Sequence, residues 1–299
     1  MELTIQELLQ SIPDLEIREE EDLCEYTGFR TGGKATVLFP LSLEALKTVL
    51  SLLKENKAPY FILGNGSNVL ALDEGYSGFI VSLKKCCNDL AVEGDRIRCG
   101  AGVALNVLCR TALDHSLTGL EFAYGIPGTV GGAVYMNAGA YGGEIKDVLQ
   151  EVCYLDEEFV FHEAPVLEAC LEYRNSIFQR KDWVILSGTF KLTHGDEPSI
   201  KQRMDELIQK RKEKQPLEYP SCGSTFKRPV GGYAAELIER AGLKGKQIGG
   251  AQVSEKHAGF IINKEHASSQ DILDLMEYVS DEVFHQFGVR LEREVEVLS

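Results

Sequence analysis

The sequence lacks the patterns on which several common classes of protein depend. No apolar run approaches the ~20 residues that a membrane-spanning helix needs. The acidic start MELTIQELLQSIPDLEIREEE has neither the basic residues nor the apolar core of a signal peptide. The 8 cysteines form no CxxC pair and the 6 histidines stand apart, which disfavours a structural metal site. We therefore expect a soluble, cytosolic protein with reduced thiols, no metal and no membrane partner.

Positive charge is also scarce. The formal net charge is −15, which argues against non-specific binding of nucleic acid. The cations that are present gather in the stretch QKRKEKQPLEYPSCGSTFKR at 209–228. Such a cluster in an acidic protein predicts a site for a small anion, although a solvated helix end explains the charges equally well.

The familiar nucleotide motifs are missing as well, because there is no GxxxxGK[ST] and no GxGxxG followed by a helix and a ribose-binding acid. Two other segments are rich in bare backbone: LGNGSNVL at 63–70 and GIPGTVGGAVYMNAGAYG at 125–142. Successive peptide N–H groups in such loops can converge on an anion, whereas the alternative for 63–70 is a tight turn between strands. Two such loops suit a long ligand with two phosphates, and FAD fits this description better than ATP.

The hydrophobic pattern predicts an α+β fold. Helices are expected at 44–56, 104–115, 199–215 with Ser199 as its cap, 233–242 and 268–287. Strands are expected at 58–64, 78–83, 151–156, 159–164, 183–192, 247–253, 258–262 and 289–299, with a hairpin at 90–102 that turns at Gly94-Asp95. We predict a body over 1–195 that divides near 85, a smaller α+β lobe over 196–288, and a final strand over 289–299 that returns to the body.

Five motifs stand in order along the chain: GNGSN, GIPGTVGGAVYMNAGAYGGEI, EYRNSIF, PLEYPSCGSTFKRP and LEREVEV. With TGFRTGGKA at 27–35, they resemble the UDP-N-acetylenolpyruvoylglucosamine reductases, flavoenzymes of bacterial cell-wall synthesis, from about residue 25 to the end. The resemblance implies the FAD-binding fold of the vanillyl-alcohol-oxidase type with a smaller C-terminal α+β lobe for the substrate. It also implies that NADPH reduces FAD, which then reduces the enolpyruvyl group of a UDP-sugar to UDP-N-acetylmuramate. A monomer is expected.

By the same resemblance, both glycine-rich segments cradle the FAD. Neither segment contains His or Cys, the residues that tether the flavin in many oxidases of this fold, so we expect FAD to be held non-covalently. The implied residues are Gly64, Asn65, Gly66, Ser67 and Asn68 in the first segment, and Gly125, Ile126, Pro127, Gly128, Thr129, Val130, Gly131, Asn137, Ala138, Gly139 and Ala140 in the second.

The resemblance also implies three catalytic residues, of which the first is Arg174 in EYRNSIF. Its guanidinium is permanently charged and presents a rigid donor fork suited to a carboxylate. A surface ion pair with Glu172 or Asp182 is the plainer interpretation. After YRNSIFQRK the chain enters the strand WVILSGTF at once, so it resembles the type of this family that lacks a substrate-covering tyrosine loop.

Ser224 in GSTFKRP matches the family's proton donor, although serine beside glycine usually bonds its own backbone. Glu294 matches the acid that holds the enolate or shares its proton. Glu292 would point to the same face of a strand, and charged edge strands are common, so alternation alone does not choose between the two acids.

The basic stretch is expected to take the UDP diphosphate through Lys214, Lys227 and Arg228. Two alternatives stay open. One is an FAD-dependent oxidase or dehydrogenase of the same fold that acts on an alcohol or a sugar, and the other is a flavin-binding module without turnover.

Overall fold

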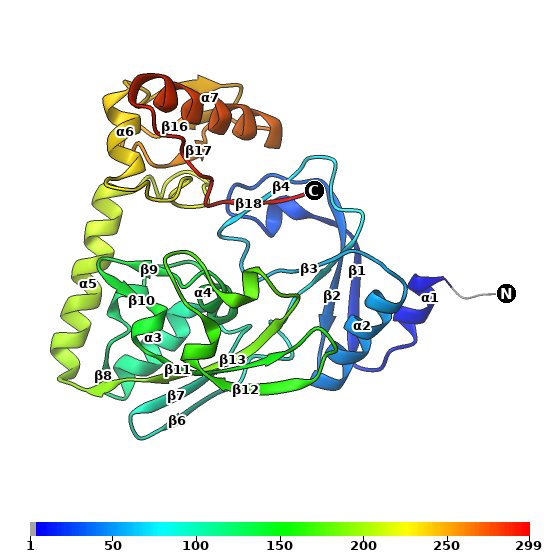
Figure 1. Ribbon diagram of the computed structural model, residues 1–299. Helices are drawn as coiled ribbons and strands as arrows, with labels where there is room; N and C mark the ends of the chain where they lie inside the picture. The colour runs from blue at the N-terminus through cyan, green and yellow to red at the C-terminus, as the bar shows by residue number, and fades with distance from the viewer. Residues whose placement is uncertain (1–3) are drawn as a thin grey trace. The chain divides into compact units, whose positions relative to one another are not determined.

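The computed structural model describes residues 4–299 and divides them into two compact units (Figure 1). Unit 1 comprises the N-terminal residues up to Glu19, then Thr36–Asn65 and Gly78–Gln209, and unit 2 comprises Glu20–Ala35, Gly66–Ser77 and Lys210–Ser299. Each unit has a hydrophobic core of its own. This grouping rests on contacts within the chain, and the division into domains at 1–195, 196–288 and 289–299 stays a prediction.

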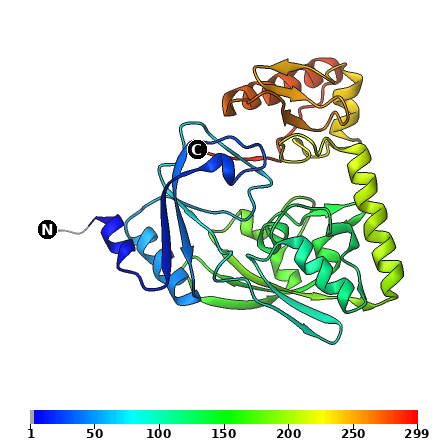
Figure 2. The same cartoon turned by 180° about the vertical axis from the view of Figure 1, so that it is seen from behind.

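The first sheet of unit 1 has the strand order β1-β2-β5-β3, in which β2 and β3 both pair in parallel with β5. The four strands are β1 (Leu15–Asp22), β2 (Lys34–Pro40), β5 (Phe79–Val81) and β3 (Tyr60–Ile62). Helix α2 (Leu43–Glu55) begins where the Ser42 side chain accepts the Ala45 N–H. Its buried face supplies leucine and valine to the same core as the sheet, and the short helix α1 (Ile5–Gln10) contacts α2 (Figure 2).

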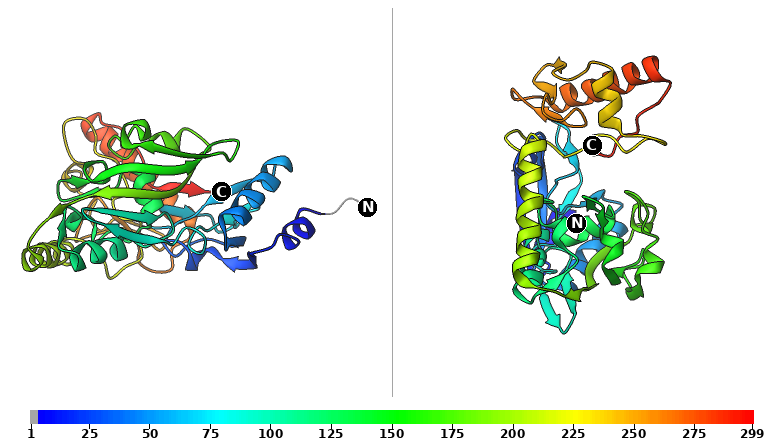
Figure 3. Two further views of the ribbon diagram at one scale, coloured as in Figure 1. Left: turned by 90° about the horizontal axis from the view of Figure 1, so that it is seen from below. Right: turned by 90° about the vertical axis from the view of Figure 1, so that its left-hand side faces the viewer.

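The second sheet of unit 1 is antiparallel, with the strand order β12-β11-β13-β7-β6. The strands are β12 (Phe161–Pro165), β11 (Leu149–Leu155), β13 (Val184–Lys191), β7 (Arg96–Gly100) and β6 (Leu90–Glu93). The predicted hairpin is confirmed, and it projects from the edge of the sheet in Figures 2 and 3. Helix α4 (Val130–Tyr135) packs against β13, and α3 (Leu105–Asp114) packs against α4.

Two short pairs complete unit 1. Strand β8 (Leu117–Thr118) pairs with β14 (Thr193–His194), and β9 (Gly139–Ala140) pairs with β10 (Gly143–Glu144). Single 3-10 turns occur in both units at Leu23–Glu25, Glu121–Ala123, Ile145–Asp147, Val166–Ala169 and Ile177–Gln179.

Unit 2 is built on an antiparallel sheet of β15 (Gln247–Ile248), β16 (Ala251–Val253) and β17 (Ile261–Asn263). Helix α7 (Ser269–Phe287) packs against all three strands and against α6 (Ala234–Arg240). Strand β4 (Val69–Ala71) lies parallel to β18 (Glu296–Leu298), so the C-terminal strand pairs with the end of the first glycine-rich segment.

Three details of the predicted elements are wrong. The strand expected at 247–253 is two antiparallel strands, β15 and β16, joined by a turn at 249–250. Helix α5 (Glu197–Lys214) begins before Ser199, because the Asp196 carboxylate accepts both the N–H (3.1 Å) and the hydroxyl (2.7 Å) of Ser199 and so caps the helix. The predicted strand at 289–299 is a strand only over Glu296–Leu298. No helix within residues 4–299 is both long and apolar enough to cross a bilayer.

Candidate active site

The two glycine-rich segments meet within unit 1. Asn65 Nδ2 donates to the Pro127 carbonyl at 3.2 Å. A Cβ atom placed on Gly64 would lie 2.5 Å from Thr129 Oγ1, so only glycine allows this approach. Segments about sixty residues apart in the sequence are therefore in direct contact, as expected if they share one ligand.

The next residue of the first segment, Gly66, belongs to unit 2 and leaves no room for a side chain. Its φ is +60°, and a Cβ atom would lie 1.9 Å from the Tyr26 carbonyl oxygen. The Gly66 carbonyl accepts the Gly28 N–H at 2.9 Å. The TGFRTGG motif thus packs backbone to backbone against the GNGSN turn, which explains why both motifs are rich in glycine.

The donors of these segments fit a pyrophosphate. Within residues 4–299, the structure gives no protein acceptor to the backbone N–H of Gly64, Asn65, Gly66 or Ser67. The same holds for Gly125 and Gly128 in that range. Unused N–H groups beside bare backbone are the chemistry that an anion nest supplies. The residues present therefore fit the FAD that the sequence predicts.

Part of the second segment is not loop, and its donors are already used. Residues 130–135 form α4, and Thr129 Oγ1 accepts the Gly132 N–H at 3.3 Å. The N–H groups of Val130 and Gly131 donate to Val103 and Ala101 carbonyls, each at 2.9 Å. The glycines here pack the helix closely on its neighbours, and a role for Val130 and Gly131 in FAD binding stays a prediction.

Asn137 holds the second segment together through its side chain. The residue is fully buried with φ +41°. Its Nδ2 donates to Glu144 Oε2 (2.9 Å) and to the Glu172 carbonyl (2.8 Å), and its Oδ1 accepts the Lys146 N–H (3.0 Å). These three bonds use all the donors and one lone pair of the amide. Its predicted contact with FAD is untested.

Arg174 is fixed on the same segment. Its Nη2 donates to the Gly139 carbonyl at 3.0 Å and its Nη1 to the Asn137 carbonyl at 3.4 Å. The guanidinium carbon also lies 5.1 Å from the centre of the Tyr173 ring. The structure therefore places this permanent cation against main-chain carbonyls of the predicted flavin segment, which a surface ion pair with Glu172 or Asp182 would not require.

The other two predicted catalytic residues, Ser224 and Glu294, lie on hydrogen-bonded segments of unit 2. Thr225 joins them: its carbonyl accepts the Glu294 N–H (2.9 Å), and its N–H donates to the Gly259 carbonyl (2.8 Å). Its hydroxyl oxygen accepts the Ile261 N–H (3.0 Å). Thr225 is fully buried, whereas Ser224 beside it is exposed. A buried anchor thus places the serine next to the segment that carries Glu294.

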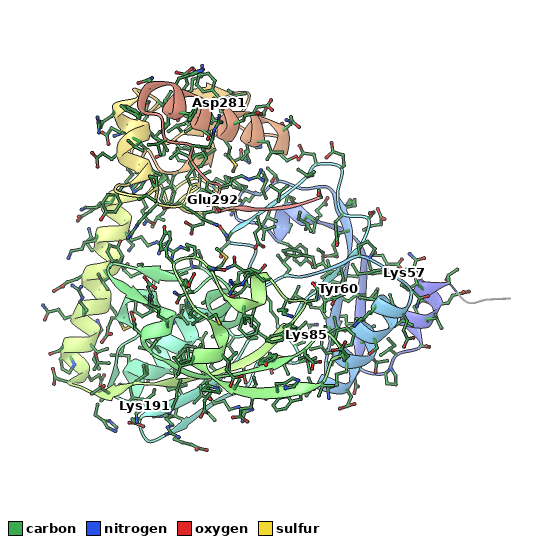
Figure 4. The ribbon with its side chains drawn as sticks, viewed as in Figure 1. Lys57, Tyr60, Lys85, Lys191, Asp281 and Glu292 are labelled. Carbon is green, nitrogen blue, oxygen red and sulfur yellow. The ribbon has the colours of Figure 1, made fainter. Side chains whose placement is uncertain are left out.

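The surroundings of Glu292 and Glu294 differ, although alternation does not separate them. Glu292, labelled in Figure 4, is exposed and its carboxylate pairs with Lys227. Glu294 is half-buried, and its carbonyl accepts Asn68 Nδ2 at 3.0 Å. Asn68 in turn accepts the Glu296 N–H at 3.0 Å. The structure therefore links Glu294, and not Glu292, to the first glycine-rich segment.

The predicted diphosphate ligands are exposed or engaged elsewhere. Lys214 ends α5 and is exposed, as a solvated helix end would be. Lys227 pairs with Glu292, and the Arg228 guanidinium lies 5.1 Å from the Tyr233 ring centre. Their role in binding the substrate stays a prediction.

The sequence left two structural residues of unit 2 unnoticed. Thr225 gave no signal beyond its place in GSTF. Asn263 donates to the Phe29 carbonyl (2.9 Å) and accepts the Ala267 N–H (2.7 Å). Cys222 also makes a buried hydrogen bond in this unit. Its thiol donates to the Val69 carbonyl (3.3 Å), and burial raises its pKa to about 12. A buried polar side chain of this kind can be found only once its partners are known.

The chain as a whole is similar to known proteins of one family. Residues 215–298 match the family model of the UDP-N-acetylenolpyruvoylglucosamine reductase C-terminal domain, and residues 35–158 match an FAD binding domain. The UDP-N-acetylenolpyruvoylglucosamine reductase of Clostridium novyi is 50% identical over 99% of this chain and 97% of its own length. That of Caldanaerobacter subterraneus is 47% identical over 99% and 98%. The crystal structure of the Thermus caldophilus enzyme superposes with a TM-score of 0.82 at 34% identity, over 95% of this chain and 100% of that one.

Proposed function

The chain belongs to the family of UDP-N-acetylenolpyruvoylglucosamine reductases, and from this premise we propose how its own residues perform the reaction. It has the FAD-binding fold of the vanillyl-alcohol-oxidase type and is an FAD-dependent oxidoreductase. It reduces the enolpyruvyl group of UDP-N-acetylglucosamine enolpyruvate to UDP-N-acetylmuramate for peptidoglycan synthesis, with NADPH as reductant. Family membership excludes the two alternatives, which were an oxidase of an alcohol or a sugar and a flavin-binding module without turnover.

When bound, FAD would supply the hydride-transfer chemistry that links NADPH to C3 of the enolpyruvyl group. We propose that the chain holds FAD non-covalently through the backbone donors of Gly64, Asn65, Gly66 and Ser67 and through Gly125 and Gly128. The support is the set of unused N–H groups at these positions within residues 4–299. Neither segment offers a His or Cys side chain that could tether the flavin.

Ser224 is the proposed proton donor to C2. After hydride reaches C3, the substrate is an enolate whose carbon is strongly basic, so even a hydroxyl can protonate it when it is well positioned. The observation that carries this proposal is the fully buried Thr225, whose three hydrogen bonds hold the exposed Ser224 beside the segment that carries Glu294. Glu294 is the proposed group that holds the enolate or shares its proton.

Arg174 is the proposed cation at the substrate carboxylate, where negative charge builds during the reaction. Its guanidinium is held by the Asn137 and Gly139 carbonyls, so little side-chain freedom is lost when it binds an anion. Donors fixed in advance stabilise a developing charge better than donors that must reorganise. Lys214, Lys227 and Arg228 are the proposed contacts to the UDP diphosphate.

We further propose that the protein works in the cytosol as a monomer. The support is the substrate of this family, a small UDP-sugar.

Ser224→Ala tests the mechanism by separating its two half-reactions. Reduction of the flavin by NADPH should stay near the wild-type rate, because the serine takes no part in that step. Reoxidation by the enolpyruvyl substrate should slow by roughly 10²–10⁴-fold, the contribution of a positioned acid, which is about 3–5 kcal/mol of barrier. Stopped-flow absorbance at the oxidised-flavin band measures each half separately.

Ser224→Cys is the matched control, since a thiol can still donate a proton and should recover part of the lost rate. Equal slowing of both half-reactions in Ser224→Ala would indicate a damaged site. Normal reoxidation in that variant would remove Ser224 from the mechanism and leave a turn serine.

A further inference from the structure

Two cysteines of unit 1 face each other outside the site described above. Cys86 and Cys87 lie in the turn that follows β5, and their Sγ atoms are 3.8 Å apart. Cys86 is half-buried, so part of it contacts solvent. Cys87 is buried, with 7% of its surface exposed. Lys85, labelled in Figure 4, marks this turn and pairs with Glu16. Of the eight thiols, these two lie close enough for a hydrogen bond between their sulfur atoms.

The two thiols have unequal acidities. The hydrogen bond from the Cys87 thiol lowers the pKa of Cys86, and the same contact together with burial raises the pKa of Cys87. Only the thiolate form of cysteine is a nucleophile. The accessible member of the pair is therefore the more reactive one, and its buried neighbour keeps a proton.

We propose that Cys86 and Cys87 form a redox-active dithiol that a hydroperoxide oxidises reversibly. The Cys86 thiolate attacks one oxygen of hydrogen peroxide, which breaks the O–O bond, leaves a sulfenic acid on Cys86 and releases hydroxide. That hydroxide takes the Cys87 proton and becomes the first water. The Cys87 thiolate then attacks the Cys86 sulfur, the S–O bond breaks, and the hydroxide that leaves takes up the proton that Cys86 had lost, which gives the second water. The sum is two thiols and one peroxide converted to one disulfide and two waters, so two electrons pass from sulfur to peroxide oxygen.

A disulfide between neighbouring residues is strained, which makes the change reversible. Adjacent Cα atoms across a trans peptide are about 3.8 Å apart, whereas disulfides usually join Cα atoms roughly 4.4–6.8 Å apart. The backbone around Cys87 must therefore rotate when the ring closes. Strained disulfides have high reduction potentials and are the labile, regulatory kind, so cellular dithiols would reopen this one.

A rotation of the backbone at Cys87 would also move residues that contact the second glycine-rich segment. The Cys87 N–H donates to the Leu83 carbonyl (2.9 Å), and the Cys87 carbonyl accepts the Gly102 N–H (2.8 Å). The next residue back, Ala101, accepts the Gly131 N–H at 2.9 Å. Gly102 is tightly packed, since a Cβ atom there would lie 2.4 Å from the Leu83 carbonyl oxygen. Oxidation would thus shift Ala101 and loosen the anchor of Gly131, a consequence that rests on the proposed FAD site.

Peptide mass measures the modification directly. The purified holoenzyme is treated with hydrogen peroxide, free thiols are alkylated, and the chain is digested with trypsin. Cleavage after Lys85 and Arg96 gives the peptide CCNDLAVEGDR, which contains both cysteines and no other. We expect this peptide to be lighter by two hydrogen atoms and to escape alkylation until dithiothreitol is added. A fully alkylated dithiol in this peptide, at peroxide levels that oxidise exposed Cys170, would overturn the proposal.

Matched variants then connect the modification to FAD. Peroxide should make the wild-type protein release FAD about fivefold faster, the weight of one backbone hydrogen bond, as followed by flavin fluorescence, and dithiothreitol should reverse this. Cys170→Ser should respond like the wild type, and Cys86→Ser should not respond. An oxidised peptide with unchanged FAD release would overturn the coupling. Untreated protein that holds no FAD would instead contradict the proposed function, and the mass of the peptide would still decide the dithiol.

Discussion

The two glycine-rich segments look alike in sequence and are held in opposite ways. The first is positioned by the absence of a side chain, because Gly66 lies so close to Tyr26 that a Cβ atom would be 1.9 Å from its carbonyl oxygen. The second is positioned by the presence of one, because the buried Asn137 amide joins three separated stretches. Glycine content alone therefore does not say whether sterics or hydrogen bonds limit a loop.

Gly66→Val should have the largest effect, because it inserts a branched side chain where backbone is in contact. Positive φ costs a non-glycine residue about 1–2 kcal/mol, and the steric clash adds to this cost. We therefore expect the free energy of unfolding to fall by more than about 4 kcal/mol. The variant should bind little FAD. Acid precipitation followed by absorbance of the supernatant measures the flavin, and in the wild type all of it should be released because no side chain tethers it.

Gly94→Val is the control for this variant. Gly94 has nearly the same φ, +61°, but a Cβ atom there meets nothing within 4 Å. Both variants pay the conformational cost, and only Gly66→Val adds the contact with Tyr26. Full FAD loading in Gly66→Val would place the pyrophosphate elsewhere, and flavin that remains on the acid-denatured wild type would contradict non-covalent binding.

The sequence predicted the long elements of the fold well and the short ones poorly. Apolar periodicity predicted α2 and α7 nearly to the residue, because each buries one continuous face. It missed α4, since VGGAVY is too short and too rich in glycine for a helical pattern to emerge. It overextended the last strand, because LEREVEV alternates well beyond β18, the part that pairs with β4.

The residues of the candidate site also differ in how far the sequence could predict them. The resemblance could identify Arg174, Ser224 and Glu294 because their motifs are short and ordered. It could not foresee Thr225, whose importance comes from hydrogen bonds to residues over 30 positions away. Nor could it assign Asn137 a structural role, since a buried amide and a ligand-binding amide are the same letter.

Asn137→Ala tests the second mode of positioning and should have an intermediate effect. The variant loses three buried hydrogen bonds, worth roughly 0.5–1.5 kcal/mol each, and places alanine at positive φ. We expect unfolding to become easier by about 2–4 kcal/mol, measured from the midpoint of denaturation in urea, and Arg174 to lose its fixed position.

Asn137→Gly separates the two causes. Glycine accepts positive φ without strain but makes none of the amide's hydrogen bonds. If hydrogen bonds hold this segment, both variants should be destabilised to a similar extent. Recovery of wild-type stability in Asn137→Gly would show that backbone strain dominates, and the contrast between the two segments would then disappear.

Asn68→Ala should have the smallest effect and tests whether the first segment also positions the proposed catalytic residue Glu294. The Asn68 side chain donates to the Glu294 carbonyl at 3.0 Å, while its own carbonyl accepts the Glu296 N–H. Alanine keeps the second bond and removes the first, worth about 1 kcal/mol. Reoxidation of the flavin by substrate should therefore slow about fivefold, with reduction by NADPH unchanged.

Ser67→Ala is the control for Asn68→Ala, because Ser67 lies in the same turn and is equally predicted to contact FAD, while the bond to Glu294 comes from Asn68. If Asn68 acted only through FAD, both variants would weaken FAD binding alike and neither would separate the half-reactions. A slowing of reoxidation confined to Asn68→Ala would mean that the turn which receives the cofactor also sets the position of Glu294. In that case the first segment works through one side chain as well as through its glycines, and the difference between the two segments is one of degree.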